Sequence, residues 1–155
     1  MNFYATYTKV AEGCQYKIKD EIVTIDENKD ITEWVCRGLR NLVFERTGVN
    51  EESFSKVFAA KKDGAYLGAL IAETSWNIMA IRYLYVDPLY RKQGLGTSLI
   101  QSAIEFALKQ GYSSIVVETM SFYDYQFYLK MGFYLEFKRD GYANGVSQYY
   151  LCKSL

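Results

Sequence analysis

The segment from Leu84 to Thr97 contains the residues whose types and spacing most clearly suggest chemistry. Arg91, Gly94 and Gly96 follow the spacing R-x-x-G-x-G, after an apolar run and before a helical pattern. Glycines let the backbone turn tightly and approach a ligand, and the free N–H groups of a helix's first turn converge on an anion. The segment therefore predicts a pyrophosphate site. A purely structural interpretation, in which the glycines serve only a tight strand-to-helix connection, stays open.

The spacing also limits which phosphate ligand the turn would bind. It differs from the dinucleotide fingerprint G-x-G-x-x-G and from the P-loop, so neither a nicotinamide cofactor nor ATP is the expected ligand. The eighteen basic and eighteen acidic side chains cancel, which argues against nucleic-acid and membrane partners. Any phosphate site must therefore be local.

The content of histidine and cysteine excludes several kinds of chemistry. The chain has no histidine, which rules out a Ser-His-Asp triad, a Cys-His pair and an imidazole metal site. Its three cysteines are widely spaced without a C-x-x-C, so we expect no disulfide framework and no metal. Without a signal-peptide pattern or an apolar run long enough to span a membrane, the expected location is cytoplasmic.

The first part of the chain is predicted to form a strand and a helix. With 155 residues, half of them hydrophobic, we expect a single domain over residues 1–155, in which residues 1–14 stay unassigned. The imperfect alternation over 16–25 predicts a strand. A 3.6-residue apolar stripe over 31–46 predicts an amphipathic helix with Asp30 as its N-cap, and Gly48 lies near its end.

The middle of the chain is predicted to hold a hairpin and a parallel unit. Lys62-Asp63-Gly64 is a hairpin turn signal between residues 56–62 and 65–73, and a third strand follows over 78–86. Residues 97–110 predict a helix that Gly111 ends, and the short apolar run 114–118 predicts a buried strand. Together they form a β-α-β unit, and a ligand would lie at the carboxyl ends of its two strands.

The last part of the chain predicts a short helix over 123–131 and a hairpin over 133–139 and 146–153. The whole pattern predicts an α/β (α+β) fold. Its sheet is mixed and mostly antiparallel, with a central parallel β-α-β unit, and helices flank the sheet.

Two motifs give this order of elements a family resemblance. Val86-Asp-Pro-Leu-Tyr-Arg-Lys-Gln-Gly-Leu-Gly96 and Phe127-Tyr-Leu-Lys-Met-Gly-Phe133 stand in the order and spacing of the GNAT superfamily, whose members are acetyl-CoA-dependent N-acetyltransferases. The chain resembles this family over about residues 16–155. It also looks like a subgroup of small single-domain bacterial members, through Gly68 to Trp76 and Met120-Ser-Phe122.

The resemblance implies how acetyl-CoA, the expected co-substrate, would bind. In this family the strand before the glycine turn carries a bulge and splays from the next strand, opening a V-shaped slot for the pantetheine arm. Backbone groups of that strand would bond the arm, and N–H groups of the turn would hold the pyrophosphate. Ser121 stands where many members place an asparagine. The implied cofactor-binding residues are Leu84, Tyr85, Val86, Arg91, Lys92, Gln93, Gly94, Leu95, Gly96, Thr97, Ser121 and Tyr128.

The resemblance also implies catalytic residues. Tyr128 matches the tyrosine that commonly protonates the CoA sulfur, and its phenol has a reference pKa of about 10, near that of a thiol. A packed aromatic is the alternative. Glu73 lies where the family often places a carboxylate that removes the amine's proton through water. Glu118 is a second candidate, as base or as substrate anchor, and a solvated strand end is its alternative.

The acceptor pocket is expected to contain aromatic residues, although such residues more often belong to a core. If Glu73 and Glu118 both face the cleft, a cationic or polyamine-like acceptor is favoured. The expected substrate-binding residues are Trp34, Trp76, Tyr83, Glu118 and Phe122.

These features predict an N-acetyltransferase that moves an acetyl group from acetyl-CoA to a primary amine of a small molecule, directly in a ternary complex. A protein or peptide N-acetyltransferase is one alternative and would need an open groove beside the final hairpin. A non-catalytic CoA-binding module is another, and would lose nothing when Tyr128 and Glu73 are changed. Many family members form homodimers, and nothing in this sequence requires one.

Overall fold

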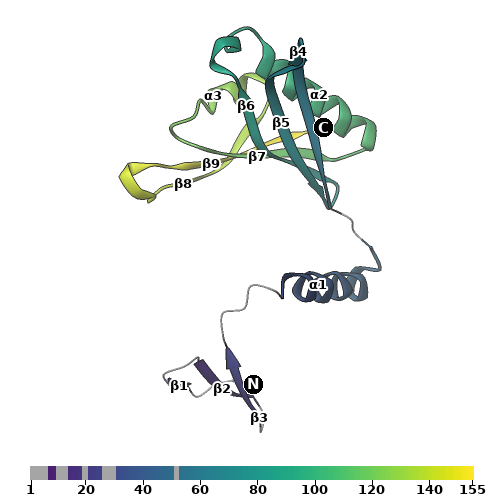
Figure 1. Cartoon of the computed structure of the whole chain (residues 1–155), viewed down its shortest axis with the longest axis vertical. Coiled ribbons are helices and arrows are strands. Elements are labelled where there is room, and N and C mark those ends of the chain that lie inside the picture. Colours follow the sequence, from purple (N-terminus) through teal and green to yellow (C-terminus); the bar gives the residue numbers. More distant parts are fainter. Residues whose placement is uncertain (1–6, 10–13, 19–20, 26–30, 51–52) are drawn as a thin grey trace. The chain divides into compact units, whose positions relative to one another are not determined.

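The computed structural model divides into two compact units, Met1–Asn50 and Glu51–Leu155 (Figure 1). No helix among the residues it describes is long and apolar enough to cross a membrane. The described residues are 7–9, 14–18, 21–25, 31–50 and 53–155.

The first unit begins with a three-stranded antiparallel sheet. Its strands are β1 (Tyr7–Lys9), β2 (Cys14–Ile18) and β3 (Glu21–Ile25), in the order β1-β2-β3. The prediction of one strand over 16–25 is therefore wrong, since β2 and β3 pair with each other. The sequence gives a reason: the polar pair Lys19-Asp20 interrupts the apolar alternation after Ile18. β1 lies within residues 1–14, for which we predicted no element.

A helix, α1 (Thr32–Thr47), completes the first unit and confirms the predicted amphipathic helix. Its N-cap is Ile31, without a side-chain capping bond. The prediction of Asp30 as N-cap is wrong, and Asp30 itself lies outside the described residues. At the other end Gly48 takes a φ of 70° and its N–H donates to the carbonyl of Phe44, so glycine ends the helix as predicted.

The second unit is built on a six-stranded sheet in the order β4-β5-β6-β7-β9-β8. β6 and β7 pair in parallel, and every other neighbouring pair is antiparallel. This confirms the predicted mixed, mostly antiparallel sheet with a central parallel unit. The strands are β4 (Phe54–Lys62), β5 (Ala65–Ser75), β6 (Ile78–Val86), β7 (Ser114–Met120), β8 (Tyr134–Arg139) and β9 (Gln148–Ser154).

Two tight turns connect the first three of these strands. Asp63 and Gly64 both have positive φ between β4 and β5, and Trp76 and Asn77 do so between β5 and β6. Positive φ at both central residues gives a turn whose twist matches that of the strands. The hairpin predicted from Asp-Gly is confirmed.

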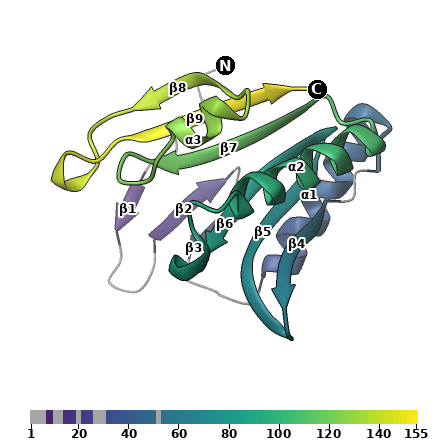
Figure 2. The same ribbon diagram turned by 90° about the horizontal axis from the view of Figure 1, so that it is seen from above.

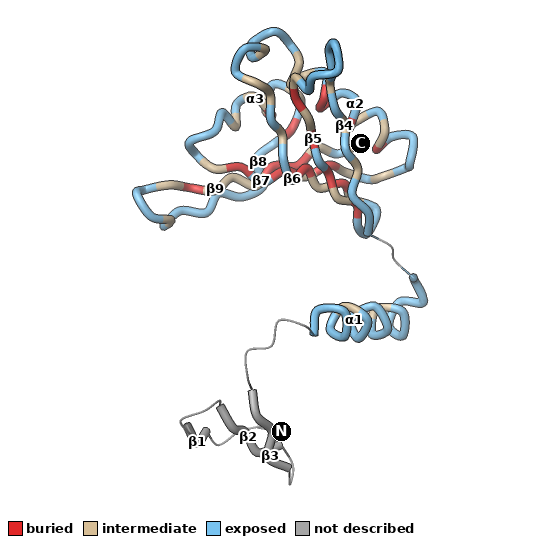
Figure 3. Tube along the Cα trace, in the orientation of Figure 1, coloured by how far each residue is buried: buried red, intermediate tan, exposed pale blue. Residues whose placement is uncertain are grey.

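Helix α2 (Leu95–Gln110) packs against β4, β5, β6 and β7 (Figure 2). The core lies between this helix and the sheet, and the buried segments in Figure 3 follow it. Gly111 ends α2 at a φ of 74°, as predicted. The most deeply buried large side chains are Leu70, Met79, Ile100, Ile115 and Leu151.

The last helix, α3 (Gln126–Lys130), is shorter than the predicted 123–131. A turn occupies the beginning of that range, since the N–H of Tyr123 donates to the carbonyl of Met120 at 2.9 Å. The Asp124 carboxylate then accepts from the Gln126 N–H at 3.1 Å, so the helix begins only after this bond. The β8–β9 hairpin follows and confirms the predicted final hairpin.

Candidate active site

The site begins where β6 leaves β7. The register of β6 against β5 shifts between Ile71 and Ala72, so β6 carries a bulge at Arg82. Parallel pairing with β7 covers four positions and ends at Ile81 opposite Val117. Both strands continue beyond that point without pairing with each other. The bulge and the splayed strands implied by the family resemblance are therefore confirmed.

A cleft of about 920 Å³ lies between these diverging strand ends, a volume typical of a small-molecule site. Its lining comes from β6, the glycine turn, β7, α3 with its preceding turn, and β9. All of these elements belong to the second unit. The carboxyl ends of β6 and β7 thus face the cleft, at the position that the β-α-β topology predicts.

The glycine turn leads into α2 with an unusual backbone. Lys92 and Gly94 both have positive φ, at 58° and 85°. Gly94 is the N-cap of α2 and makes no side-chain capping bond. Among the described residues, none accepts a hydrogen bond from the N–H groups of residues 92–97. A helix start with several free N–H groups at a cleft has a charge and geometry that suit an anion.

Two side-chain features fix the shape of this turn. The Arg91 Nε donates to the carbonyl of Val86 at 2.9 Å, which ties the turn back to the end of β6. A Cβ on Gly96 would lie 3.4 Å from the Phe127 ring, in ordinary contact, so the start of α2 lies against α3. At Gly94 a Cβ would meet no protein atom within 4 Å, so space does not limit the residue type. Its positive φ is what favours glycine.

The edge of β6 offers backbone groups to the cleft. The N–H of Asp87 donates to the carbonyl of Leu67 on β5 at 2.9 Å. Because backbone groups alternate between the two sides of an antiparallel strand, Leu84 and Val86 direct theirs away from β5. The Val86 carbonyl is bonded by Arg91, which leaves the Val86 N–H and both groups of Leu84 for a ligand. An extended arm could add to this edge as a strand does.

Tyr128 lies in α3, lines the cleft and is 8% exposed. Its ring packs edge-on against Phe127 and Phe133, with centroids 5.1 Å and 5.8 Å away. Burial raises the pKa of its phenol to about 12. In the described part of the chain no group hydrogen-bonds to its hydroxyl, so this buried O–H has a bond to offer to a bound molecule.

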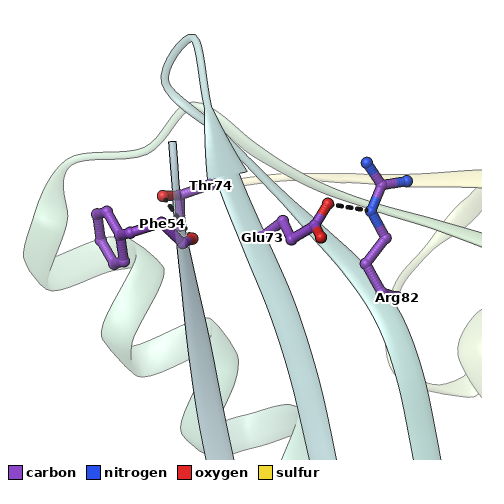
Figure 4. Close-up of polar contacts among 4 residues, drawn as sticks. All are labelled: Phe54, Glu73, Thr74 and Arg82. Carbon is purple, nitrogen blue, oxygen red and sulfur yellow. Dashed lines mark hydrogen bonds and ion pairs between the residues drawn. The ribbon is translucent and has the colours of Figure 1, made fainter. Parts of the chain in front are cut away.

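The two candidate carboxylates lie in different surroundings. Glu73 on β5 forms an ion pair with Arg82 at the bulge of β6, at 2.7 Å, with both side chains 46% exposed (Figure 4). Beside it, the Thr74 hydroxyl donates to the carbonyl of Phe54 at 3.2 Å and holds β5 to β4. Arg82 lines the cleft, but Glu73 does not. Glu118 on β7 does line it.

The structure brings most of the predicted cofactor residues together. All of them line the cleft except Gln93 and Ser121. The Gln93 amide donates to the carbonyl of Leu89, within the turn. Ser121 exchanges two bonds with Ser147: its hydroxyl accepts from the Ser147 N–H, and its own N–H donates to the Ser147 carbonyl. In this structure Ser121 therefore ties the end of β7 to the final hairpin.

Of the expected acceptor-binding residues, Tyr83 and Glu118 line the cleft. Trp76 lies in the turn between β5 and β6, and Phe122 packs against Tyr123 with centroids 4.5 Å apart; neither lines the cleft. Trp34 belongs to the first unit, in α1.

The sequence reasoning missed several lining residues, among them Tyr123, Asp124 and Gln148. The first two precede the tyrosine box and could have been found as neighbours of Tyr128. Gln148 carries no motif. Only its register against Met120 at the end of β7 places it at the cleft.

Comparison with known proteins agrees with this architecture. Residues 21–133 match the Acetyltransferase (GNAT) family, and the chain belongs to that family. A blasticidin-S acetyltransferase of Streptomyces morookaense is 30% identical over 99 residues, covering 63% of this chain and 73% of that protein.

Solved structures share the fold at lower identity. An acetyltransferase from Bacillus cereus superposes with a TM-score of 0.78 at 21% identity, over 86% of this chain and 98% of that one. A Bacillus anthracis protein described as a streptothricin acetyltransferase, in complex with acetyl coenzyme A, superposes with a TM-score of 0.61 at 19% identity. The match covers 98% of this chain and 84% of that one.

Proposed function

We propose that the chain is a cytoplasmic N-acetyltransferase, acting as one domain over residues 1–155, which transfers an acetyl group from acetyl-CoA to a primary amine of a small molecule. The observation that carries the proposal is the slot between β6 and β7, which ends at the uncapped start of α2 and has Tyr128 in its lining. Acetyl coenzyme A bound to the Bacillus anthracis protein of the same fold supports the co-substrate.

The cofactor half of the cleft suits a pantetheine arm with a pyrophosphate. The free backbone groups of Leu84 and Val86 would bond the arm along the edge of β6. The N–H groups of residues 92–97 would surround the pyrophosphate, and the helix dipole adds ~0.3–1 kcal/mol. Arg91 and Lys92 line the same end of the cleft and supply positive charge.

The reaction forms a C–N bond to the acceptor and breaks the C–S bond of the thioester. The attacking amine must be neutral, and it loses a proton as the bond forms. The departing sulfur needs a proton, which the Tyr128 hydroxyl would donate. Because burial raises the pKa of this phenol to about 12, it keeps its proton at neutral pH until the thiolate develops.

The amine's proton would leave through water to a carboxylate. Glu73 is the candidate that we proposed from the sequence, and its partner Arg82 lines the cleft. Glu118 lines the cleft itself and is favoured as an anchor for the acceptor, with Tyr83 on the opposite strand. The assignment can be tested because Glu73→Gln should lower kcat, whereas Glu118→Gln should mainly raise the KM of the amine.

The experiment is a thiol-release assay with acetyl-CoA and a panel of primary amines, each compared with the alcohol of the same skeleton. The panel includes blasticidin S and streptothricin, because similar proteins carry those names, and one peptide with a free N-terminus. Amine-dependent thiol release with an N-acetylated product supports the proposal. Acetyl-CoA binding without turnover of any amine would instead favour a non-catalytic CoA-binding module.

A further inference from the structure

The amino end of β9 carries a hydrogen-bond network that the proposed mechanism does not use. The Gln148 Nε2 donates to the Glu118 Oε2 at 2.8 Å, and both residues line the cleft. The Gln148 Oε1 accepts from the Tyr150 hydroxyl at 3.0 Å and also from the Tyr142 hydroxyl. A single amide thus joins β7, β9 and the loop of the final hairpin.

The orientation of this amide is fixed by its partners. An ionised carboxylate has no proton to donate, so the NH₂ group of Gln148 must point at Glu118. The two tyrosine hydroxyls then occupy the two acceptor sites of Oε1. These three bonds fix the orientation of the Gln148 amide, because exchanging its NH₂ group and its oxygen would break all of them. The NH₂ group therefore stays directed at Glu118.

A cation on β8 lies beside this network. Tyr142 is the largest cause of a raised pKa at Arg139, and the negative charge of Glu118 is a smaller one. The Arg139 guanidinium lies 5.5 Å from the Tyr150 ring. Burial is the largest cause of a raised pKa at Tyr150. Both groups therefore keep their protons at neutral pH. The hydrogen bonds run in one direction, from the Tyr142 and Tyr150 hydroxyls through Gln148 to Glu118, and bonds in such a chain strengthen one another.

This arrangement leaves one carboxylate oxygen available. Within the described residues, the Glu118 Oε1 has no hydrogen-bond partner. Of the other charged groups in the cleft lining, Arg91 and Lys92 lie at the glycine turn, Arg82 pairs with Glu73, and Asp124 accepts from the Gln126 N–H. The Glu118 end is therefore suited to a cation.

We propose that Gln148 is a positioning residue that holds Glu118 as an anchor for a second positive charge on the acceptor, so that the site selects primary amines carrying another cationic group. The inference rests on the proposed function. Since the attacking amine must be neutral, an ammonium bound by Glu118 has to be a different group of the same molecule.

The test compares cadaverine with n-pentylamine, which have the same carbon chain and differ by one amine. For the wild type we expect kcat/KM to favour cadaverine about tenfold, from roughly a twofold statistical advantage and about fivefold from an exposed ion pair. Glu118→Gln should reduce the preference to about twofold. Gln148→Leu should reduce it to an intermediate value by raising the KM for cadaverine more than the KM for n-pentylamine.

Gln101→Leu is the matched control, because Gln101 is exposed on α2 and away from the cleft. It should keep the tenfold preference. An unchanged preference in a folded Gln148→Leu protein that binds acetyl-CoA normally would overturn the inference. If that variant does not fold, Tyr142→Phe combined with Tyr150→Phe carries the same test, because it removes the hydroxyls that orient the amide.

The wild type separates this inference from the function on which it rests. If acetyl-CoA binds but cadaverine is not preferred, or if neither probe is acetylated, the inference is wrong and other amines remain as acceptors. If acetyl-CoA does not bind at all, both fail.

Discussion

At the scale of single residues, Tyr128 combines burial with a place in the cleft wall. The sequence predicted its position from the box Phe127 to Phe133, but not its surroundings. The edge-on packing against Phe127 and Phe133 depends on how α3 meets β8. A tyrosine held in this way can donate its proton from a fixed position.

Replacing Tyr128 by phenylalanine tests this role. The change removes one oxygen and keeps the packing, so we expect kcat to fall about a hundredfold, the scale of general-acid catalysis. Acetyl-CoA affinity, measured by calorimetry, should change less than about twofold. Tyr125→Phe is the control, because Tyr125 stacks on Tyr149 and does not line the cleft. Equal turnover in wild type and Tyr128→Phe would remove Tyr128 as the acid.

The raised pKa of Tyr128 also predicts a pH profile. A pKa of about 12 means that the phenol stays protonated well above the pH at which a free tyrosine ionises. The rate should therefore rise with pH as the acceptor amine, whose pKa is about that of a lysine side chain, loses its proton, with no decline up to about pH 10.5. The measurement is kcat/KM against pH with n-pentylamine or another accepted amine. A decline centred below pH 10 would show that another group is the acid.

At the scale of elements, the glycine turn and the start of α2 form the proposed phosphate site. Both glycines at the ends of α2 have positive φ and open space around them: Gly94 at the start and Gly111 at the end. Valine at either position should cost ~1–2 kcal/mol of stability, because a β-branched residue is strained at this φ.

Only the change at Gly94 should affect the co-substrate. We expect Gly94→Val to weaken acetyl-CoA binding at least tenfold, because the added side chain would fill the space beside the free N–H groups. Gly111→Val introduces the same backbone strain at the far end of the helix and serves as the control. Calorimetric titration of both variants is the measurement. Equal acetyl-CoA affinity in the two would contradict the phosphate assignment.

Elements with a strong local signal were predicted best. The Asp63-Gly64 turn and the Gly111 stop are set by neighbours in sequence, and the structure has both. The prediction failed over 16–25, where Lys19-Asp20 interrupts the apolar pattern. It also failed at the start of α3, where a turn and the bond from the Gln126 N–H to Asp124 precede the helix. Gln148 was missed because its place depends on strand register, which no local pattern encodes.

At the scale of the whole molecule, basic and acidic side chains balance, so an anionic ligand must be bound by a local arrangement. One end of the cleft offers such an arrangement, with basic side chains and free N–H groups at the glycine turn. Tyr128 and Glu118 also line the cleft. All of the residues that line it belong to the second unit.

The most direct test of the proposed function is the melting temperature of the chain with and without acetyl-CoA. Ligand at about 100 times its dissociation constant stabilises the native state by ~2.7 kcal/mol, which raises the melting temperature by several degrees. We predict such a rise for the wild type and for Tyr128→Phe, and a smaller one for Gly94→Val. No rise in the wild type at millimolar acetyl-CoA would contradict the proposal, and would mean that the glycine turn only connects β6 to α2.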